Sequence, residues 1–460
     1  MSILASFMVP HPPLIIPKVG RGGEKQIEKT ISAYQEVARQ IAKINPETII
    51  ISSPHAPFYS DYFYISSSKN ATGDLSNFGA KDIAFDEEID EELVLEIEKI
   101  ATKNNFPAGR TIKKEKIDHG TIVPLYFIRK YLPKCKIIIV GLSTLPLIDN
   151  YKFGKIIKEA VNNLNKNAVF VASGDLSHKL KSYGPYGFAK EGPEYDKKIM
   201  SLCENANFYE LLSFKESFLE KASECGHRSF LIMAGFLDSL NIKASKYSYE
   251  DVTGVGYGIC SFYPNGENKE RNFEEKYLQE QKLIIKKQIE DSDTYVELAR
   301  LTIEEYINNN KILKIPTNIE EELLTNKAGV FVSIHKFDTL RGCIGTILPT
   351  KKSIAEEIIS NAISASAKDP RFTPITKDEL KYLEINVDIL SPPETIDSLT
   401  MLNPKKYGVI VSSGLKRGVL LPNLDGIDTI EEQLKIAKRK ANITKDEKIT
   451  IQRFEVIRHK

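Results

Sequence analysis

The sequence predicts an α/β protein of two domains, and three observations lead to that prediction. The chain has 460 residues, which is enough for two or three domains of about 100–200 residues each. Strand-like and helix-like segments alternate up to residue 263, as in a largely parallel sheet covered by helices. A turn-rich break, PNGENK at 264–269, and a charged helical segment follow. We therefore expect domains at 1–265 and 290–460, joined by a helical linker at 266–289.

The expected strands of the first domain are short apolar or β-branched runs, which are typical of strands buried on both faces of a sheet. These strands are 3–9, 48–51, 136–140, 168–172 and 256–262. Between them, apolar residues recur at helical spacing. The helices expected from this spacing are 24–44, 87–104, 151–165 and 228–240.

The second domain is expected to contain both helices and strands. A hairpin is expected at 411–421, around Gly414 and Gly418. The other expected elements are helices at 294–308, 353–368 and 429–441 and strands at 329–335 and 383–390.

Composition excludes several classes of protein. Lys plus Arg number 63 and Asp plus Glu 62, so we expect no nucleic-acid partner, and zinc-finger spacing and RNP-like motifs are absent. No apolar run approaches the ~20 residues of a membrane helix, and the start of the chain lacks signal-peptide features. Five Cys are too few for a disulfide scaffold. We expect a cytoplasmic protein that does not bind membranes; the sequence is compatible with a homo-oligomer.

Histidines concentrate in the first domain, where five of the seven lie before residue 228. His11 (VPHPP) and His55 (SSPHAP) follow the first two expected strands, and His178 (SGDLSH) follows a later one; His119 lies in DHGT. The carboxyl ends of parallel strands meet at one edge, where open α/β sheets bind ligands. Flanking prolines restrict the backbone at His11 and His55. The pattern predicts a shared metal or catalytic site.

A carboxylate beside two His ligands would complete the facial triad of non-haem Fe(II) enzymes. Glu224, in ASECGHR, is our candidate, and the adjacent Cys225 is an alternative soft ligand. Asp118 and Asp175 lie close enough in sequence to orient the rings of the neighbouring histidines.

Taken in order, MVPHPP, SPH, DHG, SGDLSH and ECG resemble the LigB-type class III extradiol dioxygenase and Memo-like superfamily over 1–263. This resemblance implies a three-layer domain with Fe(II), or Zn or another divalent metal, held by His11, His55 and Glu224. It implies that His119 and His178 lie in the catalytic pocket, where His178 or His119 would take a proton from a small aromatic diol and return one later as the ring is opened. The Memo-like branch has a Cys-Gly segment at Cys225, so the alternative is a metal-binding or redox protein without ring cleavage.

In the second domain, LRGCIGT at 340–346 contains an arginine that could bind an anion and a cysteine that could be a nucleophile. With SASAKDPRF and SSGLKRGVLLP, it resembles the AMMECR-type domain over about 290–457. The resemblance suggests a mixed α/β fold with a signature face. Our candidates for that face are Arg341, Cys343, Asp369 and Arg371, with Cys343 as the catalytic residue. The fusion resembles the AmmeMemoRadiSam system protein A family, which implies a radical-SAM partner protein. An interaction module without catalysis is the remaining alternative.

Overall fold

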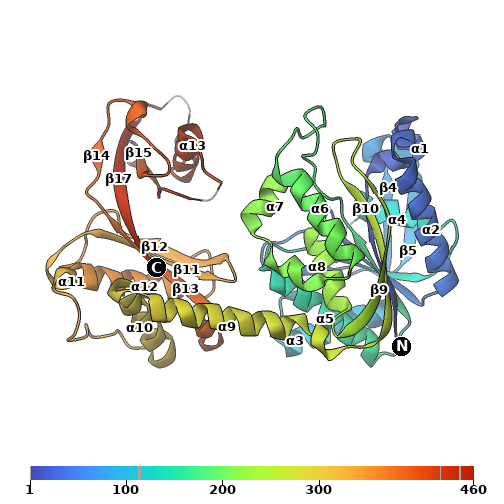
Figure 1. Cartoon of the computed structure of the whole chain (residues 1–460), viewed down its shortest axis with the longest axis horizontal. Coiled ribbons are helices and arrows are strands. Elements are labelled where there is room, and N and C mark those ends of the chain that lie inside the picture. Colours follow the sequence, from blue (N-terminus) through green and yellow to red (C-terminus); the bar gives the residue numbers. More distant parts are fainter. Residues whose placement is uncertain (1, 112–115, 425, 445–446) are drawn as a thin grey trace. The chain divides into compact units, whose positions relative to one another are not determined.

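The computed structural model describes residues 2–111, 116–424, 426–444 and 447–460. Backbone contacts divide the chain into two compact units, Met1–Leu278 and Gln279–Lys460. The division falls inside a long charged helix, α9 (Phe273–Asp291), which is visible in Figure 1. Each unit is built around its own sheet.

The N-terminal unit contains an eight-stranded sheet in the order β6-β3-β7-β2-β8-β1-β10-β9. Its four central strands run parallel and are almost entirely buried: β7 (Lys136–Gly141), β2 (Thr48–Ser53), β8 (Ala168–Ser173) and β1 (Ile3–Val9). Burial on both faces explains their unbroken apolar sequences. The flanking strands are β10 (Tyr257–Glu267), β9 (Leu240–Glu250), β3 (Phe63–Ile65) and β6 (Ala108–Arg110). The expected mostly parallel sheet is confirmed.

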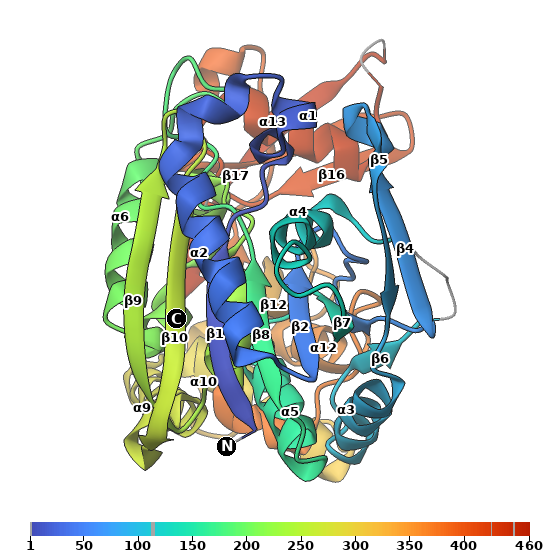
Figure 2. The ribbon, with the colours of Figure 1, turned by 90° about the vertical axis from the view of Figure 1, so that its right-hand side faces the viewer.

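Helices cover both faces of this sheet, so the unit has three layers. On one face, α2 (Glu28–Ile44) packs against α4 (His119–Ile128), and Figure 2 looks onto this side. On the other face, α5 (Leu147–Asn163) packs against both α8 (His227–Phe236) and α3 (Glu91–Lys103). Shorter or peripheral helices are α1 (Pro17–Gly20), α6 (Glu191–Glu204) and α7 (Glu216–Ala222).

The helix expected at 87–104 begins later than its sequence suggested. Asp90 accepts a hydrogen bond from the backbone N–H of Leu93 and caps α3, which starts at Glu91. The residues before it form β5 (Ala80–Glu88), which pairs with β4 (Asn70–Leu75) in a separate two-stranded sheet. The acidic run therefore spans a strand end, a cap and a first helical turn.

The C-terminal unit has a seven-stranded sheet whose pairings among the described residues are all antiparallel, and it confirms the mixed α/β prediction. The path is β12 (Thr339–Gly345), β11 (Gly329–Lys336), β13 (Leu383–Leu390), β17 (Thr450–His459), β15 (Tyr407–Ser413) and β16 (Lys416–Leu420), with β14 (Glu394–Thr395) beside β17. The helices are α10 (Thr294–Asn309), α11 (Glu321–Thr325), α12 (Ile354–Ala367) and α13 (Ile430–Lys440).

Side-chain alternation in β11 separates two environments. Val330, Val332 and Ile334 are fully buried and belong to the core formed with α10 and α12. Successive strand residues point to opposite faces, so Ser333 and His335 project from the other side of the sheet.

Candidate metal centre

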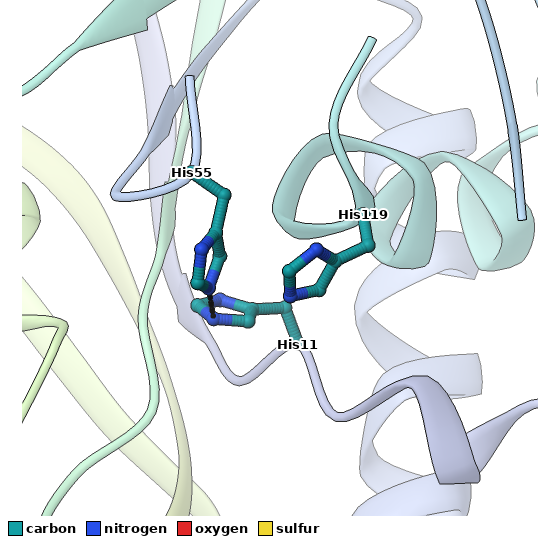
Figure 3. A group of neighbouring side chains, drawn as sticks. All are labelled: His11, His55 and His119. Carbon is teal, nitrogen blue, oxygen red and sulfur yellow. Dashed lines mark hydrogen bonds between the residues drawn. The ribbon is translucent and has the colours of Figure 1, made fainter. Parts of the chain in front are cut away.

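Three histidine rings converge at the carboxyl edge of the N-terminal sheet (Figure 3). His11 follows β1, His55 follows β2, and His119 is the first residue of α4. Their ring centroids are 4.8 Å apart for His11 and His55, 4.0 Å for His55 and His119, and 5.6 Å for His11 and His119. One ring nitrogen from each lies within 4.8 Å of the others. The structure thus brings together three of the four histidines from which the sequence predicts a shared site.

Ser173, at the end of β8, determines the proton position on His11. The Ser173 hydroxyl donates to the backbone carbonyl of Gly120 at 2.6 Å, which uses its single proton. Its 3.0 Å contact with Nδ1 of His11 is therefore a hydrogen bond that His11 donates. With Nδ1 protonated, Nε2 of His11 carries a free lone pair. This is the arrangement that a metal-ligating imidazole needs.

The lone pair of His11 faces the second histidine. Nε2 of His11 lies 3.1 Å from Nε2 of His55. Two nitrogens bound at about 2.0–2.1 Å to one metal, at an angle of roughly 90–110°, lie about 3 Å apart. The observed separation therefore fits two ligands of a single ion, with His119 beside them as a third nitrogen donor.

Burial keeps these imidazoles neutral, which metal binding requires. Burial and the neighbouring rings of His55, His119 and His178 lower the pKa of His11 well below its usual value. Burial and then His55 lower the pKa of His119 to about 4. The pKa of His55 is also lowered by burial, although Asp118 opposes this shift. At neutral pH all three rings present lone pairs.

A second group of donors shares His11 and contains Asp175 and Cys225. Sγ of Cys225 lies 3.7 Å from Nε2 of His11 and accepts a hydrogen bond from the backbone N–H of Asp175 at 3.3 Å. This approach depends on two glycines, because a Cβ on Gly174 would lie 2.2 Å from Cα of Gly226. Burial raises the pKa of Cys225 well above its usual value.

Glu224 lies next to this group, but its carboxylate takes a different position. Oε2 of Glu224 accepts a hydrogen bond from the backbone N–H of His227 at 2.6 Å, at the beginning of α8. Neither ligand group found among the described residues includes it. Burial raises the pKa of Glu224 to about 7. Its role as a ligand remains a prediction.

His178 lies beside the three converging histidines, and its backbone N–H donates to the carbonyl of Ser223 at 3.2 Å. Burial and then His55 lower its pKa to about 4. Nε2 of His178 is buried and has no hydrogen-bond partner in the described part of the chain. An orphaned buried nitrogen at this place suits contact with a bound molecule.

The two carboxylates that were expected to orient neighbouring rings instead accept hydrogen bonds from backbone N–H groups. Asp118 caps α4 by accepting from the backbone N–H of Thr121, and it also accepts from the hydroxyl of Ser53. Asp175 accepts from the backbone N–H of His11 at 2.7 Å. Ser173 was missed as the residue that orients His11, although it opens the SGDLSH motif that was noted for His178.

Comparison with known families decides the relationship of this unit. Residues 5–260, more than half of the chain, match the family described as the catalytic LigB subunit of aromatic ring-opening dioxygenase. The chain belongs to the LigB family. Residues 296–459 match the AMMECR1 family, so a LigB domain precedes an AMMECR1 domain.

One relative matches this chain along its whole length, and two others match only part of it. A Clostridium acetobutylicum protein is 40% identical, and the similarity covers 100% of both chains. A Thermotoga maritima protein is 51% identical over 36% of this chain and 97% of its own length. A solved structure, that of an uncharacterized Pyrococcus horikoshii protein, is 32% identical and covers 36% of this chain and 89% of its own, with a TM-score of 0.34.

In the AMMECR1 domain, Cys343 lies on β12, where a carboxylate and a guanidinium hold its peptide group. Its backbone N–H donates to Asp369 at 2.9 Å, and its carbonyl accepts from Arg371 at 2.9 Å. Arg341 lies elsewhere, with its guanidinium bonded to Glu379 and to the carbonyl of Thr373. Cys343, Asp369 and Arg371 therefore form one cluster, which does not include Arg341.

None of the helices in the described residues combines the length and the apolar character needed to cross a membrane.

Proposed function

We propose that the LigB domain is a metal-dependent oxidoreductase that opens the ring of a small aromatic diol. The observation that carries the proposal is the convergence of His11, His55 and His119, all neutral, in a chain of the LigB family. These three residues would hold Fe(II). The ion, when bound, supplies open positions for both diol oxygens and for O₂.

The chain's own residues would position the diol and move its protons. His178 is neutral, and its buried Nε2 has no partner among the described residues, so Nε2 would accept a proton from a diol hydroxyl and return it later. Aromatic side chains stand beside these histidines. The Phe78 ring lies 5.1 Å from that of His119, and the Tyr186 ring lies 5.0 Å from that of His178. Both rings could pack against a planar substrate.

Oxygen consumption tests the proposal. The full chain, loaded with Fe(II) under anaerobic conditions, is mixed with a panel of catechols in air-saturated buffer, and the zinc-loaded protein is the matched control. We expect O₂ uptake with at least one catechol and only with Fe(II), and a rate that falls about 10²-fold or more in His178→Ala. A stoichiometric Fe(II) protein that consumes no O₂ with any catechol would overturn the proposal.

A second candidate is a metal-binding or redox protein that works with a radical-SAM partner and cleaves no ring. The Cys225 thiol, 3.7 Å from Nε2 of His11, favours it, as does the engagement of Glu224 at the start of α8. A soft sulfur ligand is typical of zinc, Cu(I) and iron–sulfur sites, whereas the facial triad of Fe(II) oxygenases has two histidines and a carboxylate. Metal retention without O₂ uptake, together with co-purification of a radical-SAM protein, would support this candidate.

A further inference from the structure

The AMMECR1 domain contains a cavity of about 590 Å³ on the face of its sheet that α10 and α12 do not cover. Its lining includes Ser333, His335, Cys343, Asn386, Arg458 and Lys440. The first five come from neighbouring strands, and Lys440 is the last residue of α13. This volume is in the range of small-molecule sites.

Strand register explains why the floor of this cavity is polar. Ser333 of β11 is paired with Cys343 of β12 on one side and with Asn386 of β13 on the other. Residues directly opposite in antiparallel strands point to the same face. Sγ of Cys343 lies 3.2 Å from the hydroxyl of Ser333, so the thiol belongs to this floor.

Four cationic side chains line the cavity, Arg371, Lys440, Arg458 and Lys460, and they differ in how they are neutralised. Arg458 is held by two hydrogen bonds to Asp388, and Arg371 is held in the same way by Asp369. Lys440 forms no ion pair with any described carboxylate; its ammonium donates to a backbone carbonyl at 3.4 Å.

Lys440 also lies beside the thiol, near enough to interact electrostatically with Cys343 and Arg371. One carboxylate, that of Glu384, lines the cavity as well. Both arginines are already paired, and Lys460 is the exposed last residue of the chain. Lys440, which interacts with Cys343, is therefore the group best placed to offer its charge to a ligand beside the thiol.

Two orphaned polar atoms belong to the same cavity. Nδ1 of His335 and Oδ1 of Asn386 are buried and have no hydrogen-bond partner among the described residues. Leaving a buried polar atom unsatisfied is costly, so such atoms mark places where a polar ligand or water completes the structure.

We propose that this cavity binds a small organic anion, with its carboxylate or phosphate at Lys440 and its body against the thiol of Cys343. The inference is independent of the metal centre, since every residue that carries it lies in the AMMECR1 domain. Carboxylate and phosphate share the chemistry that the cavity recognises, and the test distinguishes them.

The rates at which a negatively charged and a neutral reagent alkylate the Cys343 thiol report the charge around it. Iodoacetate carries a carboxylate and iodoacetamide is its neutral counterpart. In either reaction the sulfur–carbon bond forms, the carbon–iodine bond breaks, iodide leaves and the thiol proton goes to solvent. Peptide mass spectrometry of the full chain gives the rate at Cys343, with the buried Cys203 and Cys260 as internal references.

The variant is Lys440→Met, and the matched control is Lys435→Met, which removes an exposed charge from the same helix. We expect the ratio of iodoacetate to iodoacetamide rates at Cys343 to fall by at least about twofold in Lys440→Met, because a positive charge that attracts the carboxylate of iodoacetate is lost. Lys435→Met should keep the wild-type ratio.

Protection experiments identify the anion. Inorganic phosphate and acetate are added at matched ionic strength, with chloride as the reference, and slower alkylation of Cys343 reports binding. Protection by phosphate alone assigns a phosphate-bearing ligand, and protection by acetate alone assigns a carboxylate. Protection by both anions assigns the class that they share. The proposal requires the Lys440→Met effect and protection by at least one anion; any other combination overturns it.

Discussion

Ser173 accepts a hydrogen bond from Nδ1 of His11 at 3.0 Å because its own proton is committed to the carbonyl of Gly120. This contact joins β8 to the residue that follows β1. It leaves Nε2 of His11 free to act as a ligand, 3.1 Å from Nε2 of His55. A serine with no charge thus prepares the candidate metal centre.

Replacement of Ser173 should therefore weaken metal binding without removing a ligand. In Ser173→Ala we expect the dissociation constant for Fe(II) to rise about 10- to 100-fold, as for other residues that orient ligating histidines. Anaerobic titration of the full chain measures it. Ser6→Ala is the matched control, because Ser6 is equally buried in β1 and its hydroxyl has no partner among the described residues. Equal affinities for the two variants would contradict the positioning role.

If the Glu224 carboxylate caps the beginning of α8, its replacement should change protein stability but not metal binding. Glu224→Ala removes the acceptor of the backbone N–H of His227, so the free energy of unfolding should fall by about 1 kcal/mol. The metal affinity should stay within about threefold of wild type, because the Glu224 carboxylate belongs to neither ligand group. Exposed Glu220 provides the control variant, Glu220→Ala. Loss of metal from a folded Glu224→Ala protein would establish Glu224 as a ligand instead.

Gly174 should be intolerant of any side chain. A Cβ there would lie 2.2 Å from Cα of Gly226, and both are backbone positions that cannot move independently. We expect Gly174→Ala to lower the free energy of unfolding by about 1–3 kcal/mol, measured by urea denaturation. Gly23→Ala is the control, because its nearest neighbour would be the end of the Gln26 side chain at 3.9 Å. A fully stable Gly174→Ala protein would show that the two segments are not in contact.

The ion pair of Arg341 with Glu379 should stabilise the fold in a pH-dependent way. Burial would raise the pKa of Glu379, but hydrogen bonds from Arg341 and Thr376 and the charge of Lys336 outweigh it and lower the pKa to about 2. A carboxyl whose pKa is lower in the folded state stabilises the fold above its unfolded pKa of about 4.3, and this contribution is lost as the pH falls toward 2.

Glu379→Gln should therefore cost roughly 2–3 kcal/mol of unfolding free energy at pH 7, and the difference from wild type should shrink by about half at pH 3. Urea denaturation of the full chain at both values measures it. Exposed Glu431 gives the control, Glu431→Gln, for which no such difference is expected. A difference that is the same at pH 3 and pH 7 would refute this account of Arg341.

Much of the N-terminal fold was predictable because its physics is local. Buried parallel strands need continuous apolar runs, and β1, β2, β7 and β8 all have them. The hairpin of β4 and β5 was missed because much of β5 is exposed and its sequence alternates weakly. Acidic residues at its end favoured a helix, and only the pairing with β4 makes them a strand.

The candidate site was predictable to the extent that it depends on strand ends. His11 and His55 follow two parallel strands that lie on either side of β8, and this places them at one edge of the sheet. The proton position on His11 was not predictable, since it depends on a hydroxyl from β8 and a carbonyl from α4. The direction of the Glu224 side chain depends likewise on where α8 begins, a matter of one or two residues.

Metal stoichiometry tests the central claim most directly. The full chain is equilibrated with Fe(II) under anaerobic conditions, dialysed and analysed for bound metal, alongside His11→Ala, His55→Ala and the His335→Ala variant of the other domain. We predict about one ion per chain for wild type and His335→Ala and loss of the ion from the other two. A wild-type chain that binds no metal, or His11→Ala and His55→Ala proteins that keep it, would contradict the account.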